Sequence, residues 1–276
     1  MVKPLVTLKD FMDMALELAN LKTTPADSAI HIEGKDIRRV LFCLDVGVPE
    51  LLLAKKLDYD AVIAHHPIGD SAIVAFHEVF KRHIQQLGKA GVPREEAESA
   101  VRKKLLKLEV SNHMRSYRQT IDIAKLLKVP CMNIHTPLDE VGRRIMSNRV
   151  NGITETNVTL DDVVRTLQGL PEFQRAVTKI KIRVGSSSSL AGKTVVSHGA
   201  GTNGGYEIAR TYFKYGVNTV IYIHIDPMDL SRLKKENLGN LIVTGHVASD
   251  SVGINPFIKK LERMGIRVTR LGIIEA

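Results

Sequence analysis

Short runs of apolar and β-branched residues alternate along the chain with stretches in which apolar residues recur at helical spacing. The apolar runs predict strands, and the amphipathic stretches between most of them predict helices. This alternation is typical of α/β architecture with largely parallel sheets. The expected strands are 39–44, 61–64, 130–134, 180–184, 193–197, 218–223, 241–244 and 267–271. The expected helices are 8–18, which Thr7 caps, 49–57, 76–87, 94–108, 117–127, 205–215, 229–236 and 255–264.

The segment 148–157 is the best candidate for a join between two halves of the chain. It contains Gly152 and two turns flanked by asparagine. We therefore expect a first α/β repeat over 1–147, which includes an expanded basic helical segment at 81–128, and a second α/β repeat over 148–276.

The composition is that of an ordinary globular protein. Of the 276 residues, 44% are hydrophobic and 25% are charged, which excludes a predominantly disordered chain. The two cysteines, Cys43 and Cys131, lie in apolar runs and predict buried, reduced thiols in a cytoplasmic protein. The first five residues contain no apolar signal core, and no apolar stretch is long enough to span a bilayer. We expect no membrane association.

The net charge of +9 suggests an anionic partner, either nucleic acid or a metabolite. The excess is local, because residues 81–128 hold 12 Lys or Arg against five Asp or Glu. The helix expected at 94–108 directs Val101, Leu105 and Leu108 to one face and leaves basic residues on the other. These basic residues are Arg102, Lys103, Lys104 and Lys107. A solvated surface is the simplest interpretation, and the absence of interleaved aromatic residues gives nucleic-acid binding only weak support.

Four of the apolar runs end in histidine, two in each half of the chain. These residues are His65, His135, His224 and His246. In an open α/β sheet, ligands bind beyond the carboxyl ends of the strands, where these side chains are expected. One such histidine is most simply a turn residue, but four together favour a functional site. A duplicated α/β unit would explain their distribution.

Three motifs predict a metal site at the carboxyl ends of these strands. His65 and His66 are adjacent and diverge after a strand, so they could serve two neighbouring ions. Asp139 follows His135 by four residues, and Asp250 follows His246 by the same spacing, which suits one face of a helix. Three histidines and two aspartates form a nitrogen and oxygen ligand set that suits Zn, Mn, Fe or Co. Two divalent transition-metal ions that share a bridging carboxylate, with Asp139 as the candidate bridge, account for five ligands.

These motifs in this order resemble the NGG-interacting factor three-like family, also known as GTP cyclohydrolase 1 type 2 homologues. The resemblance covers most of the chain and includes Asp45, which follows the strand expected at 39–44. The chain resembles a divergent member, because Asp250 stands where the family usually has glutamate and the basic helices are expanded.

The resemblance implies two intertwined α/β repeats with mixed, largely parallel sheets. It also implies a dinuclear metal centre between the repeats and a ring-shaped homohexamer whose metal sites face an internal cavity. The implied metal ligands are His65, His66, Asp139, His246 and Asp250. We expect Asp45, His135 and His224 to support these ligands or to transfer protons.

A glycine-rich run at 199–204 follows the strand expected at 193–197 and opens a helix. It matches the dinucleotide pattern G-x-G-x-x-G, with Asp226 near the distance of a ribose-binding acid. A tight turn that lets the helix pack closely is the first interpretation. A phosphate cradle formed by Gly199, Gly201 and Gly204 is the second, and a dinucleotide site is the third.

The sequence thus predicts metal-assisted hydrolysis of a nucleotide or another phosphorylated, anionic small molecule. It assigns no catalytic residue. The alternative is a regulatory or interaction protein, in which the metal centre is structural and the basic helices contact nucleic acid or a protein partner.

Overall fold

The computed structural model describes residues 6–153 and 157–276. The chain divides into two compact units, and each unit is assembled from separate stretches of sequence. Unit 1 contains the chain up to Val79, Leu108–Val141 and Ile254–Ile273. Unit 2 contains Phe80–Lys107, Gly142–Gly253 and the residues from Ile274 onward. This division by contacts differs from two consecutive repeats that meet at residue 148.

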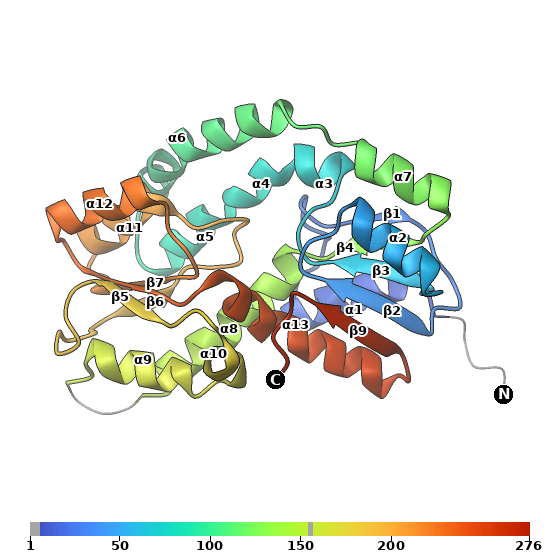
Figure 1. Ribbon diagram of the computed structural model, residues 1–276. Helices are drawn as coiled ribbons and strands as arrows, with labels where there is room; N and C mark the ends of the chain where they lie inside the picture. The colour runs from blue at the N-terminus through green and yellow to red at the C-terminus, as the bar shows by residue number, and fades with distance from the viewer. Residues whose placement is uncertain (1–5, 154–156) are drawn as a thin grey trace. The chain divides into compact units, whose positions relative to one another are not determined.

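Unit 1 is built on a five-stranded sheet with the strand order β1-β4-β3-β2-β9 (Figure 1). The strands β4, β3, β2 and β9 run parallel, and β1 pairs antiparallel with β4. The bounds are β1 Ala29–Ile32, β2 Arg39–Cys43, β3 Ala61–Ala64, β4 Cys131–Asn133 and β9 Arg267–Leu271. Helices that lie wholly in this unit are α1 Leu8–Ala19, α2 Val48–Lys56, α3 Asp70–Val74 and α7 Gln119–Leu127.

Unit 2 contains a four-stranded sheet with the order β5-β8-β7-β6, in which only β5 is antiparallel to its neighbour. This order and these directions repeat those of β1-β4-β3-β2 in unit 1. The two mixed, largely parallel sheets are therefore built on one plan, as the expected duplication requires. The bounds are β5 Lys181–Val184, β6 Thr194–Val196, β7 Thr219–Tyr222 and β8 Asn240–Val243, with α5 Arg82–Lys89, α9 Leu160–Gln168, α10 Pro171–Arg175, α11 Gly205–Lys214 and α12 Pro227–Glu236.

Several helices contain residues of both units. They are α4 Phe76–Phe80, α6 Arg94–His113, α8 Thr136–Asn151 and α13 His246–Arg263. Because α8 continues through Asn151, the first part of the join expected at 148–157 is helical, and residues 154–156 of that segment lie outside the described residues.

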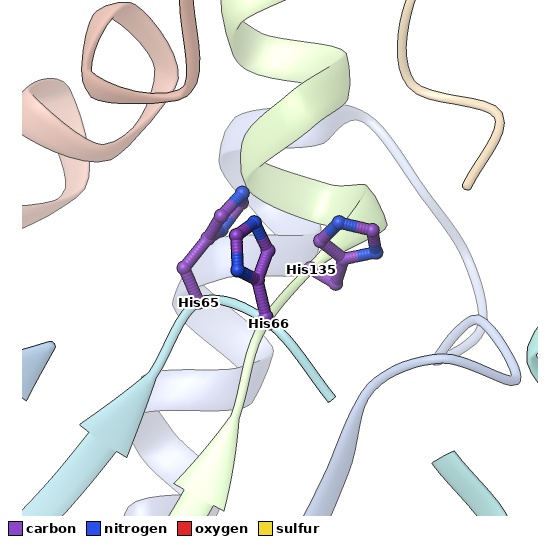
Figure 2. Close-up of side chains that lie close together, drawn as sticks. All are labelled: His65, His66 and His135. Carbon is purple, nitrogen blue, oxygen red and sulfur yellow. The ribbon is translucent and has the colours of Figure 1, made fainter. Parts of the chain in front are cut away.

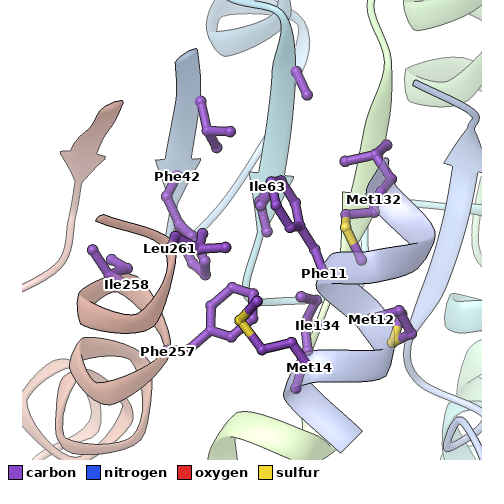
Figure 3. Close-up of a cluster of buried hydrophobic side chains, with 14 of the residues drawn as sticks. Phe11, Met12, Met14, Phe42, Ile63, Met132, Ile134, Phe257, Ile258 and Leu261 are labelled. Atoms are coloured by element: carbon purple, nitrogen blue, oxygen red, sulfur yellow. The ribbon is translucent and has the colours of Figure 1, made fainter. Parts of the chain in front are cut away.

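The core of unit 1 forms where α1 and the second part of α13 cover one face of the sheet. Figure 3 shows Phe11 of α1, Ile63 of β3 and Phe257 of α13 directed into this core, and all three are fully buried. Thr7 caps α1 as predicted, because its hydroxyl accepts from the Asp10 N–H while the Asp10 carboxylate accepts from the Thr7 N–H. Burial of these apolar side chains fixes the strand ends that carry the candidate site.

Candidate metal centre

The candidate ligands of unit 1 lie beyond the carboxyl ends of three adjacent parallel strands. Asp45 follows β2, His65 and His66 follow β3, and His135 follows β4. The register pairs Cys43 with Ala64 and Ala64 with Asn133, so the three strands end level with one another. The histidines therefore meet at one edge of the sheet, as the sequence predicted (Figure 2).

His65, His66 and His135 form a compact group. Each offers one ring nitrogen, and these nitrogens lie within 4.8 Å of one another. The His65 side chain is completely buried and that of His135 is 7% exposed. Bulk water therefore competes little with an ion for the nitrogens of these two buried rings.

Hydrogen bonds fix which nitrogen of each ring carries the proton. Nδ1–H of His65 donates to the carbonyl of Ile134 at 3.0 Å. Nδ1–H of His66 donates to the Asp45 carboxylate at 2.7 Å, and Nδ1–H of His135 donates to the Asp27 carboxylate at 2.8 Å. Carbonyl and carboxylate oxygens only accept, so the lone pair of each neutral ring is on Nε2. This is the arrangement of metal-binding histidines, whose other N–H is held by an oxygen.

The Asp139 carboxylate faces two of these rings with one oxygen each. Its Oδ1 lies 3.1 Å from Nε2 of His65, and its Oδ2 lies 3.6 Å from Nε2 of His135. Nitrogen lone pairs and a carboxylate repel one another unless positive charge lies among them. A divalent cation supplies that charge without protonation of the rings, so the donor set fits a transition-metal ion.

The corresponding positions of unit 2 repeat this pattern. His198 follows β6, His224 follows β7 and His246 begins α13 after β8. His246 and Asp250 are four residues apart on α13, as predicted, and Nε2 of His246 lies 3.2 Å from Oδ2 of Asp250. His135 and Asp139 are likewise four residues apart, but His135 follows β4 by two residues and precedes α8, whereas His246 follows β8 by three residues and is the first residue of α13. The cluster of ring nitrogens in unit 1 makes His135 a candidate ligand, beyond the supporting role expected from the sequence.

His224 differs from His65, His66 and His135 in the hydrogen bond of its Nδ1. Its Nδ1 accepts from the side-chain amide of Asn203 at 2.9 Å, and its ring lies 4.9 Å from that of His246. Burial, assisted by His246, lowers the pKa of His224 to about 4. The imidazole is therefore neutral at pH 7.

The glycine-rich run forms a turn between β6 and α11 whose carbonyls are held by basic and amide side chains. Arg82 donates to the carbonyl of Gly199, His83 to that of Thr202 and Lys104 to that of Asn203. Lys104 therefore points inward, which corrects the expected outward orientation, whereas Arg102, Lys103 and Lys107 are exposed. Gln86 adds a bond to the carbonyl of His198.

The glycines of this run serve the turn and its packing. Gly199 and Gly201 have φ values of 69° and 78°, which favour glycine. A Cβ added at Gly204 would lie 2.6 Å from Cβ of Ile208, so α11 packs closely there. Asp226 caps α12 by accepting from the Met228 N–H, which accounts for it without a ribose. Phosphate binding by Gly199, Gly201 and Gly204 stays a prediction.

Asp27, which the sequence did not predict as part of the site, is completely buried beside His135. Its carboxylate also accepts from the hydroxyl of Thr136 at 2.7 Å. It lies in an irregular segment before β1 with no motif of its own, so only its location in the folded chain reveals it.

Among the described residues, no helix combines the length and the apolarity needed to cross a membrane. No protein-family model matches the sequence, and no curated protein does.

The chain is similar over nearly its whole length to solved structures of other proteins. A NIF3 superfamily protein from Sphaerobacter thermophilus is 45% identical, with a TM-score of 0.95, and the match covers 97% of this chain and 98% of that one. Reduced HcgD from Methanocaldococcus jannaschii shares the fold at 11% identity and a TM-score of 0.57, over 96% and 98% of the two chains. The hypothetical protein SA1388 from Staphylococcus aureus shares it at 14% identity and a TM-score of 0.53, over 97% and 96%. The chain therefore belongs to the NIF3 superfamily, the family that its three motifs resemble.

Proposed function

We propose that the protein is a hydrolase that depends on two divalent transition-metal ions and acts on a nucleotide or another phosphorylated, anionic small molecule. One observation carries this proposal. Three neighbouring histidines donate their Nδ1–H groups to oxygens, and the Asp139 carboxylate faces two of them. This shared tautomer leaves each neutral ring with Nε2 as the atom that can bind a metal ion.

The proposed ligands are those that the family resemblance implies, namely His65, His66, Asp139, His246 and Asp250, with His135 as an additional ligand. Imidazole and carboxylate ligands together suit Zn, Mn, Fe or Co. One ion with open positions takes fewer ligands than this set provides, so the set would hold two ions, and Asp139 would be the candidate shared ligand.

Two such ions would activate a water molecule near neutral pH and polarise a substrate oxygen. Other residues of the chain orient the proposed metal ligands. Asp27 and Asp45 keep His135 and His66 in the ligand tautomer. The N-terminus of α11, which opens directly after Gly204, is suited to a phosphate group of the substrate because helix N-termini favour anions.

Metal analysis after reconstitution with Zn, Mn, Fe and Co tests the first step. We expect two equivalents of metal in the wild-type protein and a loss of at least one in the double variant His65→Ala/Asp139→Ala. His113→Ala is the matched control, because His113 is exposed at the end of α6. Less than one equivalent in the wild-type protein, or unchanged metal in the double variant, would refute the proposal. A screen of nucleotides and phosphate esters with the loaded protein then identifies the substrate.

The exposed side chains of α6 and of the residue after it favour a second candidate function, that of an interaction protein. Leu106 and Val110, on successive turns of α6, are 63% and 49% exposed, and Met114, directly after the helix, is 75% exposed. These side chains are close in sequence to the exposed basic residues. Nucleic-acid binding by this surface would depend strongly on salt. It would be lost in the triple variant Arg102→Gln/Lys103→Gln/Lys107→Gln and would survive removal of metal by a chelator.

We also propose that the protein assembles into a homohexamer, as the family resemblance implies. Light scattering coupled to gel filtration measures the mass of the particle directly. A monomer or a dimer at micromolar concentration would refute this part of the proposal and leave the metal chemistry intact.

A further inference from the structure

We propose that Lys104 and Asn203 hold His224 in the tautomer that carries its proton on Nε2, so that His224 is a hydrogen-bond donor to bound substrate and not a metal ligand. The role toward substrate rests on the proposed function. The tautomer itself follows from contacts within unit 2 alone.

The backbone N–H of Gly205, at the start of α11, donates to Oδ1 of Asn203 at 3.0 Å, and a backbone N–H cannot accept a hydrogen bond. The Lys104 ammonium donates to the backbone carbonyl of Asn203 at 2.6 Å and to Oδ1 of its side chain at 3.3 Å. These two donors therefore identify which atom of the Asn203 side-chain amide is the oxygen. In a flipped amide, the NH₂ group would face the Gly205 N–H and the Lys104 ammonium, and no hydrogen bond could form with either.

The nitrogen end of the same amide then faces His224. Nδ2 of Asn203 lies 2.9 Å from Nδ1 of His224 and can only donate. Nδ1 must accept, so the proton of the neutral ring is on Nε2. Asn203 is 7% exposed, so water competes little for these bonds.

The internal repeat sharpens the contrast with the ligand histidines. His224 follows β7 by two residues, as His66 follows the corresponding strand β3. His66 donates from Nδ1 to a carboxylate, whereas His224 accepts at Nδ1 from an amide. The two equivalent positions thus present opposite groups on Nε2, a lone pair in the first repeat and an N–H in the second. An N–H on Nε2 of His224 would donate to an oxygen of the anionic substrate that the proposed function assigns.

Nitrogen-15 NMR of the metal-free, histidine-labelled protein measures the tautomer, with the His224 signals assigned from the His224→Gln variant. We expect Nε2 to be protonated in the wild-type protein. In Asn203→Asp, the second carboxylate oxygen can only accept from the ring, so Nδ1 should become protonated. Asn237→Asp, at the exposed end of α12, is the matched control and should leave the tautomer unchanged. A wild-type ring protonated on Nδ1, or an Asn203→Asp spectrum equal to that of the wild type, would overturn the proposal.

Metal content and phosphate affinity test the role of the donor. We expect His224→Ala to keep both metal equivalents and to bind inorganic phosphate about tenfold more weakly, since a hydrogen bond to a charged group is lost. His224→Gln should restore part of this affinity, because its amide N–H can replace Nε2–H. Loss of metal in His224→Ala would show that His224 is a ligand and would overturn the inference. If the wild-type protein binds no metal, the proposed function fails, while the NMR measurement still decides the tautomer.

Discussion

Replacement of Asp27 by asparagine tests whether His135 binds metal. Asp27 is completely buried, and its carboxylate accepts from Nδ1 of His135 at 2.8 Å and from the Thr136 hydroxyl at 2.7 Å. An asparagine side chain has nearly the same shape but is neutral, and its NH₂ group can stabilise the wrong histidine tautomer. The loss of a supporting carboxylate typically weakens metal binding about 10- to 100-fold, which corresponds to about 1.4 to 2.7 kcal/mol.

The assay is competition for Zn or Co with a chromophoric chelator, and circular dichroism confirms that each variant is folded. Asp45→Asn is the internal comparison, because Asp45 supports His66 at 2.7 Å but its side chain is 79% exposed. Water can replace an exposed carboxylate, so we expect a smaller loss for Asp45→Asn than for Asp27→Asn. Wild-type affinity in both Asp27→Asn and His135→Ala would refute the assignment of His135 as a ligand. Asp122→Asn, on the exposed surface of α7, serves as the control.

Three further predictions concern stability and reactivity. Gly204→Ala should lower the melting temperature, because its Cβ would lie 2.6 Å from a buried isoleucine, whereas Gly88→Ala in α5 meets no atom within 4 Å and should stabilise the helix by about 0.5 to 1 kcal/mol. Burial lowers the pKa of His83 from 6.5 to about 3, so the unfolded state binds more protons between these values, and stability should fall as pH drops through this window. Urea titrations should show a smaller fall in His83→Gln, and an equal fall would contradict this cause. Burial raises the pKa of Cys43 and Cys131 to about 12, so neither thiol should react with iodoacetamide in the native protein at pH 8, and rapid labelling would disprove their burial.

The sequence was sufficient to predict the strands that carry the candidate site. Their β-branched cores end in histidine, and parallel pairing brings such ends to one edge. The sequence did not predict β1, because its four residues are all only partly buried and include His31, so apolar and polar residues do not alternate clearly along it. The sequence also could not predict the roles of Asp27 and Asn203, because their partners lie 108 and 21 residues away along the chain.

Helix α13 shows why local signals can mislead. The helix was expected over 255–264, but it begins at His246 and contains both Gly253 and Pro256. A Cβ on Gly142 of α8 would lie 3.2 Å from the backbone N of Gly253 and from the carbonyl oxygen of Ser249. Glycine at these positions therefore allows two helices to approach closely, which a single sequence cannot distinguish from a break.

The interleaved segments of the two units have a consequence for synthesis of the protein. Unit 1 needs β9, which pairs with β2 more than 200 residues earlier in the chain, whereas most of unit 2 lies between them. During translation unit 1 must therefore wait for its last strand until residues 267–271, which follow most of unit 2, have left the ribosome. The edge of β2 that β9 will cover remains open during that time, and an open edge favours pairing with other chains. We expect nascent chains truncated before residue 267 to depend on chaperones far more than chains that include β9.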